Sequence, residues 1–309
     1  MAAITEVINK GAGASSNVLG LNNAKQILKK LKSPRALWGF APGASLANDS
    51  LSAVRDLQKQ GKLIILRGVN TTEENGDDDN IETLDDTTKA VTNLGKYAFS
   101  VDFTNGLDFH KALNSISGDG AWNFAFVTSS GDLFGTTDKS GNFTGFDTGM
   151  IQASKLVFGT TQATQREGLM FQFLERDEVD SEFAFIDRQN LPFNPLKIED
   201  ITQSVVSYVN NPANTDTTVT VKVTTSDNVT AVEGLDYTYF LRTSDGATEN
   251  PTAGDDSATA GTYVLTVAAI STNEVETIRL YDNSNNRPII EDPNGDLFKS
   301  NIATATATA

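Results

Sequence analysis

The segment from residue 200 to residue 309 constrains the fold of this chain more than any other part of the sequence. It is rich in Thr, Val, Asp and Asn, and polar turns such as Asp245-Gly246 recur about every ten residues. Short strands are predicted between these turns at 202–208, 217–224, 231–232, 238–242, 261–268 and 276–281, and the alternating tail from Ile302 to Ala309 is expected to be a last edge strand. This spacing predicts an immunoglobulin-like β-sandwich over residues 200–309, although the Cys…Trp…Cys pattern of antibody domains is absent.

Composition excludes several classes of site. The chain has 309 residues and no cysteine, so disulfides, zinc–thiolate sites, iron–sulfur clusters and cysteine nucleophiles cannot form. Its 40 acidic residues outnumber 24 basic ones, which gives a formal net charge of -16. Such a surface repels phosphate backbones and anionic lipids, so we expect neither sequence-specific nucleic-acid binding nor membrane docking. The N-terminus lacks the pattern of a secretory signal, and we therefore expect the chain to be made and folded in the cytoplasm.

The chain before residue 200 is predicted to contain an N-terminal arm and a second β domain. Residues 1–60 are expected to be an arm with two short helices, one at 23–31 and one that opens at Asp49 and is stopped by Gly61. Residues 61–191 alternate apolar and polar side chains at 96–103 and 122–127, with further strands expected at 63–67, 156–158, 169–174 and 182–186 and a short helix at 108–116. Pro192 and Pro195 mark a linker. The predicted fold class is mainly β with a few short helices: a β-sandwich or barrel domain, followed by the immunoglobulin-like sandwich.

An acidic stretch at residues 71–86 interrupts this β pattern. Its carboxylates are Glu73, Glu74, Asp77, Asp78, Asp79, Glu82, Asp85 and Asp86. With so few apolar residues to anchor it, the stretch is predicted to be a solvated loop or the tip of a long hairpin. Asp77, Asp79 and Glu82 are candidate calcium ligands, because calcium prefers carboxylate oxygens. The EF-hand pattern is not met, however, and we favour a solvated loop without a metal ion.

No group of residues matches a catalytic or cofactor-binding motif. His110, the only histidine, lies among apolar residues at helical spacing, and the sequence offers it neither an orienting partner nor a nucleophile. The chain contains no Gly-x-Ser-x-Gly elbow and no phosphate-binding Gly-Lys-Ser/Thr. Trp38 and Trp122 lie in apolar runs, and we interpret them as core anchors in preference to sugar-binding platforms. We therefore expect neither an enzyme nor a bound cofactor.

The order of parts before residue 200 resembles that of the tail tube proteins of long-tailed bacteriophages. The acidic stretch leads into the strand expected at 96–103, and the helical insert follows. The region then ends in long β segments that contain Leu169-Met170-Phe171-Gln172-Phe173-Leu174 and Glu182-Phe183-Ala184-Phe185-Ile186. The resemblance covers about residues 60–190 as an architecture, with 200–309 as an appended module, and the first 60 residues go beyond the minimal tube fold.

The resemblance implies a virion structural protein whose main partners are identical subunits. Tail tube subunits form typically hexameric rings that stack around a channel, and DNA passes through this channel without specific binding. An acidic lumen would repel the DNA, and residues 73–86 would form an inter-ring loop or face the channel. Other virion proteins are further expected partners, and the module at 200–309 would make weak glycan contacts or act as a passive appendage. The alternatives are a capsid decoration or head-fibre protein, and an exported carbohydrate-binding adhesin.

Overall fold

The structure is a computed structural model that describes residues 4, 8–10, 32–83, 88–118, 122–161 and 164–309. The described part of the chain is mainly β with a few short helices, as the sequence predicts. It divides into two compact units, unit 1 (Met1–Leu57 and Lys62–Ile198) and unit 2 (Gln58–Gly61 and Glu199–Ala309). Within the described residues, no helix has both the length and the apolar composition that a membrane span requires.

The inner strands of sheet 1 of unit 1 are buried on both faces. Its strands lie in the order β1 (Ile8–Lys10), β13 (Ala184–Ile186), β9 (Leu133–Thr137), β8 (Asn123–Thr128), β2 (Pro34–Phe40) and β3 (Leu63–Arg67), and β10 (Phe143–Thr144) pairs with β9. Successive side chains of a strand point to opposite faces. On β2, Trp38 packs into one apolar core, which we call core A, and Leu37 packs into another, core B. Both faces therefore need apolar side chains, which explains the unbroken run Ala36-Leu37-Trp38.

Residues 34–57 belong to unit 1 and do not form part of an arm. Strand β2 pairs with both β3 and β8, and α3 (Leu51–Lys59) buries Val54 in core A. The structure thus differs from the expected domain boundary at residue 60. The reason is that a strand buried on both faces lacks the alternation by which a sequence reveals a strand. The helix expected after Asp49 is confirmed by α3, whereas the helix expected at 23–31 lies outside the described residues.

Sheet 2 of unit 1 packs against core B with one face. Its order is β11 (Thr148–Ala153), β12 (Glu167–Phe173), β7 (Ala98–Phe103) and β4 (Val69–Glu74). Val101 and Phe171 point into core B, and Ser100 and Met170 lie on the opposite face. Helix α4 (Leu107–Ser115) adds Leu113 to the core, and α5 (Asp177–Asp180) lies between β12 and β13. The strand expected at 156–158 is reduced to a single bridge between Val157 and Arg166.

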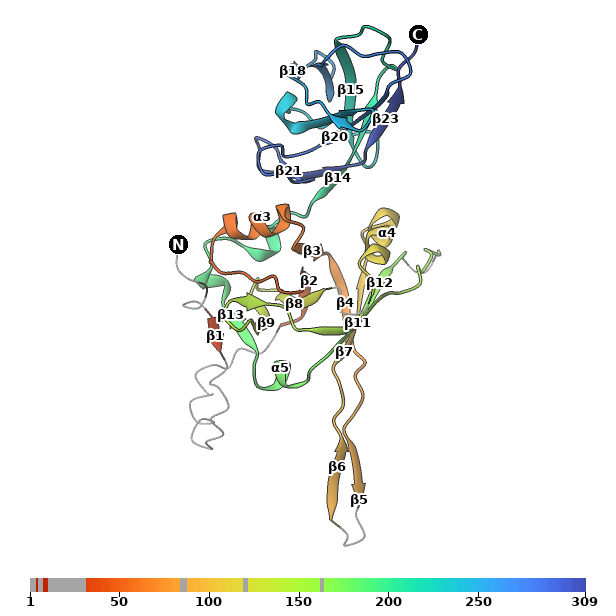
Figure 1. Cartoon of the computed structure of the whole chain (residues 1–309). Coiled ribbons are helices and arrows are strands. Elements are labelled where there is room, and N and C mark those ends of the chain that lie inside the picture. Colours follow the sequence, from red (N-terminus) through yellow and green to blue (C-terminus); the bar gives the residue numbers. More distant parts are fainter. Residues whose placement is uncertain (1–3, 5–7, 11–31, 84–87, 119–121, 162–163) are drawn as a thin grey trace. The chain divides into compact units, whose positions relative to one another are not determined.

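A long hairpin extends from sheet 2. Strands β4 and β7 lead into β5 (Asn80–Thr83) and β6 (Lys89–Asn93), which pair only with each other among the described strands. Figure 1 shows this hairpin at one end of sheet 2 and α4 at the other. The hairpin and α4 therefore mark opposite ends of unit 1 along the direction of the sheet 2 strands.

Unit 2 consists of two sheets around one core. Sheet 3 has the order β18 (Ala253–Asp256), β19 (Thr262–Thr266), β15 (Thr218–Thr225), β14 (Thr202–Tyr208), β22 (Leu297–Ser300) and β21 (Ile290–Glu291). Sheet 4 has the order β17 (Ala247–Thr248), β16 (Phe240–Ser244), β20 (Val275–Leu280) and β23 (Ala303–Thr306), which confirms the edge strand expected in the tail. Val221 of sheet 3 and Phe240 of sheet 4 meet in the shared core. Short 3-10 turns lie at Arg188–Asn190 and Pro195–Lys197 in unit 1 and at Tyr237–Tyr239 in unit 2.

Candidate functional site

The acidic stretch forms the first half of the hairpin and is not a loop. Glu73 and Glu74 lie on β4, Asp77, Asp78 and Asp79 connect β4 to β5, and Glu82 lies on β5. Asp85 and Asp86 lie outside the described residues. Of the two forms that the sequence leaves open, the structure therefore selects the hairpin. Its second strand, β6, contains no acidic residue, so the carboxylates are concentrated on one side of the ladder.

A charged cluster holds the base of the hairpin. Arg176, just before α5, donates to Asp79 through Nη1 and to Asp180 through Nε at 2.7 Å. The hydroxyl of Tyr97 donates to the other oxygen of Asp180, also at 2.7 Å, and the backbone N–H of Gly95 donates to Asp79 at 3.0 Å. The Gly95 N–H and the Arg176 guanidinium hold the pKa of Asp79 below its ordinary value, and the bond to Asp180 raises the pKa of Tyr97. These contacts fix where the hairpin leaves sheet 2.

The candidate calcium ligands do not come together. Asp79 is occupied by Arg176 and Gly95, while Asp77 and Glu82 are exposed. Across the described residues, no group of three or more acidic or histidine side chains is arranged to hold a metal ion. The positive partner of Asp79 is therefore the guanidinium of Arg176 and not a calcium ion.

Two glycines allow the strands at the base of the hairpin to approach closely. A Cβ atom on Gly95 would lie 1.7 Å from the carbonyl oxygen of Asp77, and one on Gly76 would lie 2.3 Å from that of Lys96. Any side chain at either position would force the two backbones apart. Glycine is therefore required at both positions for the geometry that brings Asp79 to Arg176.

The hairpin exposes apolar side chains. Ile81 of β5 and Val91 of β6 are cross-strand partners, with exposed fractions of 56% and 54%, and Leu94 is 55% exposed. A two-stranded hairpin with no further sheet or helix behind it is marginally stable in water. These side chains would gain stability from a surface that covers them.

The outer face of sheet 2 is mainly polar, and all strands of that sheet contribute side chains to it. One cross-strand row joins Gln152, Met170, Ser100 and Glu73, from β11 to β4. In the next row Asp102 accepts from the Thr71 hydroxyl at 3.2 Å and lies 3.7 Å from Arg166. Strands β11 and β4 are the edges of the sheet in the described structure. Their unpaired backbone groups can extend the sheet onto another chain.

A groove of about 710 Å³ opens where the hairpin leaves sheet 2. Its lining includes the rings of Tyr97, Phe99 and Phe134, all of which are partly exposed. Phe99 packs edge-on against the buried Phe126, with ring centroids 5.1 Å apart. Glu73 and Glu74 line the groove on the β4 side, and Lys32 and Arg35 also line it. An aromatic floor with charged margins suits an apolar side chain from a partner better than it suits a polar metabolite.

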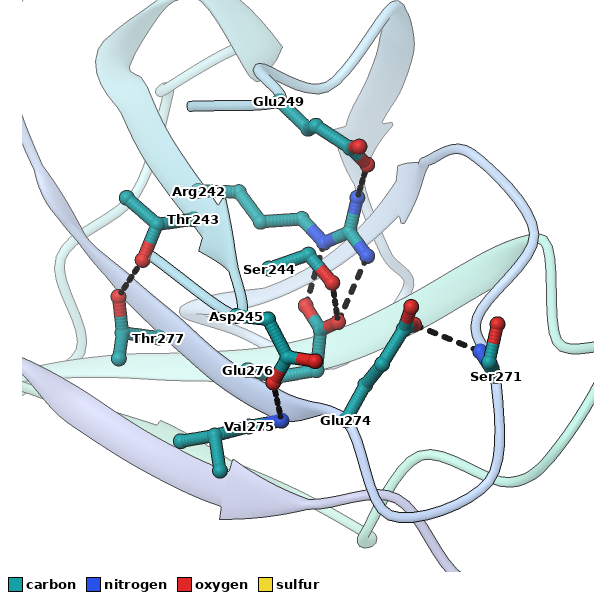
Figure 2. A network of polar contacts seen from close by, with 10 residues as sticks. All are labelled: Arg242, Thr243, Ser244, Asp245, Glu249, Ser271, Glu274, Val275, Glu276 and Thr277. Carbon is teal, nitrogen blue, oxygen red and sulfur yellow. Dashed lines mark hydrogen bonds and ion pairs between the residues drawn. The ribbon is translucent and has the colours of Figure 1, made fainter. Parts of the chain in front are cut away.

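Unit 2 contains a buried polar cluster between its sheets (Figure 2). Arg242 of β16 and Glu276 of β20 are fully buried and form a two-pronged ion pair, with Nε–Oε2 at 2.5 Å and Nη2–Oε1 at 2.8 Å. The Ser244 hydroxyl also donates to Glu276 at 2.7 Å, and Glu249 accepts from Arg242 at 3.0 Å. Burial and the negative charge of Glu276 raise the pKa of Tyr208. The Arg242–Glu276 pair is closed to solvent, whereas Glu249 is exposed, and the pair acts on the stability of unit 2.

The side chains considered for catalysis and sugar binding are mostly placed in the interior. His110 is half-buried on α4, and its Nδ1 atom has no hydrogen-bond partner among the described residues. Trp38 is fully buried in core A and stacks on Phe193 at 6.5 Å, which confirms it as a core anchor. Trp122 is partly buried against core B. Sequence reasoning missed Arg176 and the groove, because neither has a local signature: their residues come from separate segments of the chain.

Neither protein-family models nor curated proteins match this chain. Among solved structures, it is similar to the N-terminal part of the bacterial S-layer protein SbsC, with 15% sequence identity and a TM-score of 0.25. The similarity covers 34% of this chain and 24% of that chain. A similarity this weak carries no argument, so any functional conclusion has to come from the residues and geometry described above.

Proposed function

We propose that the chain is a structural subunit of a bacteriophage virion, and specifically a tail tube protein that forms stacked rings around a DNA channel. The observation that carries the proposal is the acidic hairpin. Its outer strands β5 and β6 bury no residue, and they expose Ile81 and Val91 side by side. A chain that keeps such an element gains stability only when another surface covers it, and identical copies are the simplest source of that surface.

The edges of sheet 2 give a route for ring formation. Strands β11 and β4 lie at opposite edges, so the β4 edge of one copy can pair with the β11 edge of the next. Repeated pairing of this kind closes a ring and removes the exposed edges. This arrangement is the one that the resemblance to tail tube proteins implies.

The outer face of sheet 2 suits the wall of a DNA channel. It carries Glu73, and Asp102 with Arg166 at 3.7 Å, among uncharged polar side chains such as Ser100 and Gln152. Carboxylates repel the phosphates of DNA, and the excess of negative charge on the whole chain acts in the same direction. DNA would therefore slide along this face without binding to it.

The test is the assembly state of the purified full chain, measured by negative-stain electron microscopy and light scattering. We expect rings or tubes for the wild type, and their loss in the double variant Ile81→Ser with Val91→Ser. Val264→Ser is the matched control, because Val264 is also an exposed strand valine, at 42% exposure, but lies on β19 of unit 2. A wild-type chain that stays monomeric or trimeric at high concentration would refute the tube and favour the capsid decoration, head-fibre or adhesin alternatives.

A further inference from the structure

Unit 1 exposes an apolar tip at the end of sheet 2 opposite to the hairpin. Phe158 and Val157, in the connection between β11 and β12, have exposed fractions of 72% and 52%. The bridge between Val157 and Arg166 closes the base of this connection, with N···O distances of 3.0 and 3.1 Å. Together these two neighbouring side chains form an apolar surface that a partner can cover. We call Lys155, Val157 and Phe158 the tip.

The charge around the tip is unusual for this chain. No acidic residue lies between Asp147 and Glu167, although the chain as a whole carries 40 of them. The exposed Lys155 lies beside the apolar pair. By contrast, the groove at the other end of sheet 2 has the exposed Glu73 and Glu74 on its β4 side and Lys32 and Arg35 elsewhere in its lining. Lys155 is therefore complementary in charge to the β4 margin of the groove, and the apolar side chains of the tip match its aromatic floor.

The tip and the groove of one chain cannot meet. Glu74 is level with Phe99 on β7 and Phe171 on β12. In the tip, Val157 is level with Arg166 and Phe158 lies beyond it. Five residues of strand from Phe171 to Arg166 span about 17 Å at roughly 3.3 Å per residue. Because the two surfaces lie at opposite ends of the sheet, a contact between them joins different copies head to tail and propagates along the strand direction.

We propose that the tip of one copy inserts Phe158 into the aromatic groove of the next copy along the tube axis. This inference rests on the proposed tube function and adds an axial contact distinct from the hairpin. Burial of one phenylalanine covers about 150–250 Å², far less than the roughly 800 Å² per partner of a stable pair. The contact therefore contributes useful binding energy only when it is repeated around a ring, and it then determines the strength with which one ring binds the next.

Disulfide trapping tests the contact directly, because the chain contains no cysteine of its own. Copies that carry Phe158→Cys are mixed with copies that carry Glu74→Cys under assembly conditions and then mildly oxidised. We expect a covalent dimer. A disulfide needs Cα atoms within about 7 Å, so the same two sites cannot be linked inside one chain. The matched control replaces Glu74→Cys by Ser100→Cys, on the outer face of the neighbouring strand, and gives no covalent dimer.

The remaining outcomes separate this inference from the proposed function. Tubes that form from the wild type without any link between residues 158 and 74 would overturn the inference and leave the function intact. A wild type that does not assemble would overturn both. A link between Leu28→Cys and Glu74→Cys within one chain would also overturn the inference, because the groove would then hold the chain's own N-terminal segment. As a second measurement, Phe158→Ser should shorten the tubes without lowering the unfolding temperature, since Phe158 makes so little contact with its own unit.

Discussion

The buried ion pair of unit 2 gives the sharpest stability prediction. In Glu276→Leu, the fully buried Arg242 keeps a single carboxylate partner, Glu249, whose side chain is 43% exposed. Breaking a buried pair from one side costs about 3–5 kcal/mol, because the remaining charge stays desolvated. Glu249 compensates part of this cost, so we expect a loss near the lower limit, about 3 kcal/mol. Replacement of both partners, as Arg242→Met with Glu276→Leu, should return the stability to within about 1 kcal/mol of the wild type or exceed it.

Hydrogen exchange of the full chain, measured on peptides from β16 and β20, is a suitable assay because it reports the opening of unit 2 alone. A loss of about 3 kcal/mol increases the exchange rate of protected amides on the order of 100-fold. Arg279→Met is the matched control on the same strand as Glu276. Arg279 lies over the ring of Tyr281 at 4.7 Å, and its loss should cost only about 0.5–1 kcal/mol. If Glu276→Leu exchanges no faster than this control, or if the double variant is as unstable as the single one, the reasoning from desolvation is refuted.

Three further predictions concern unit 1. Burial raises the pKa of Glu178 to about 7 from an ordinary value of 4.5. Between these pH values the native state therefore binds more protons than the unfolded state, and the free energy of unfolding falls as the pH rises through that window. Glu178→Gln should raise the unfolding temperature at about pH 8 but not at about pH 4.5, as followed by tryptophan fluorescence. Arg176→Met should increase proteolytic cleavage within residues 75–97 while the unfolding temperature of unit 1 stays nearly constant, and unchanged cleavage would show that the charged cluster does not anchor the hairpin. Gly95→Ala should disorder the same segment in hydrogen exchange, because its Cβ would overlap the Asp77 carbonyl, whereas Gly149→Ala, with its nearest neighbour at 3.5 Å, should leave the exchange unchanged.

The candidate site is only partly accessible from the sequence. The carboxylates of residues 73–82 predict an exposed element correctly, because charged side chains stay in water when they lack partners. The sequence cannot decide between a loop and a hairpin, because the pairing of β5 with β6 depends on an anchoring residue far away in the chain. Arg176 is 97 residues away from Asp79, and nothing near either residue predicts that they meet. The same holds for the groove, whose rings come from β7, β8, β9 and β12 and from Tyr97 just before β7.

The sequence by itself determines the mainly β class, most strands of unit 2 and the helices α3 and α4, because period-two and helical patterns depend on neighbours only a few residues apart. Only the tertiary structure decides that β2 lies between β3 and β8 in sheet 1, that Arg242 lies buried opposite Glu276, and that the tip and the groove lie at opposite ends of sheet 2. These features depend on which strands become neighbours. Strand pairing is settled by the burial of whole sheet faces, and no local stretch of sequence contains that information.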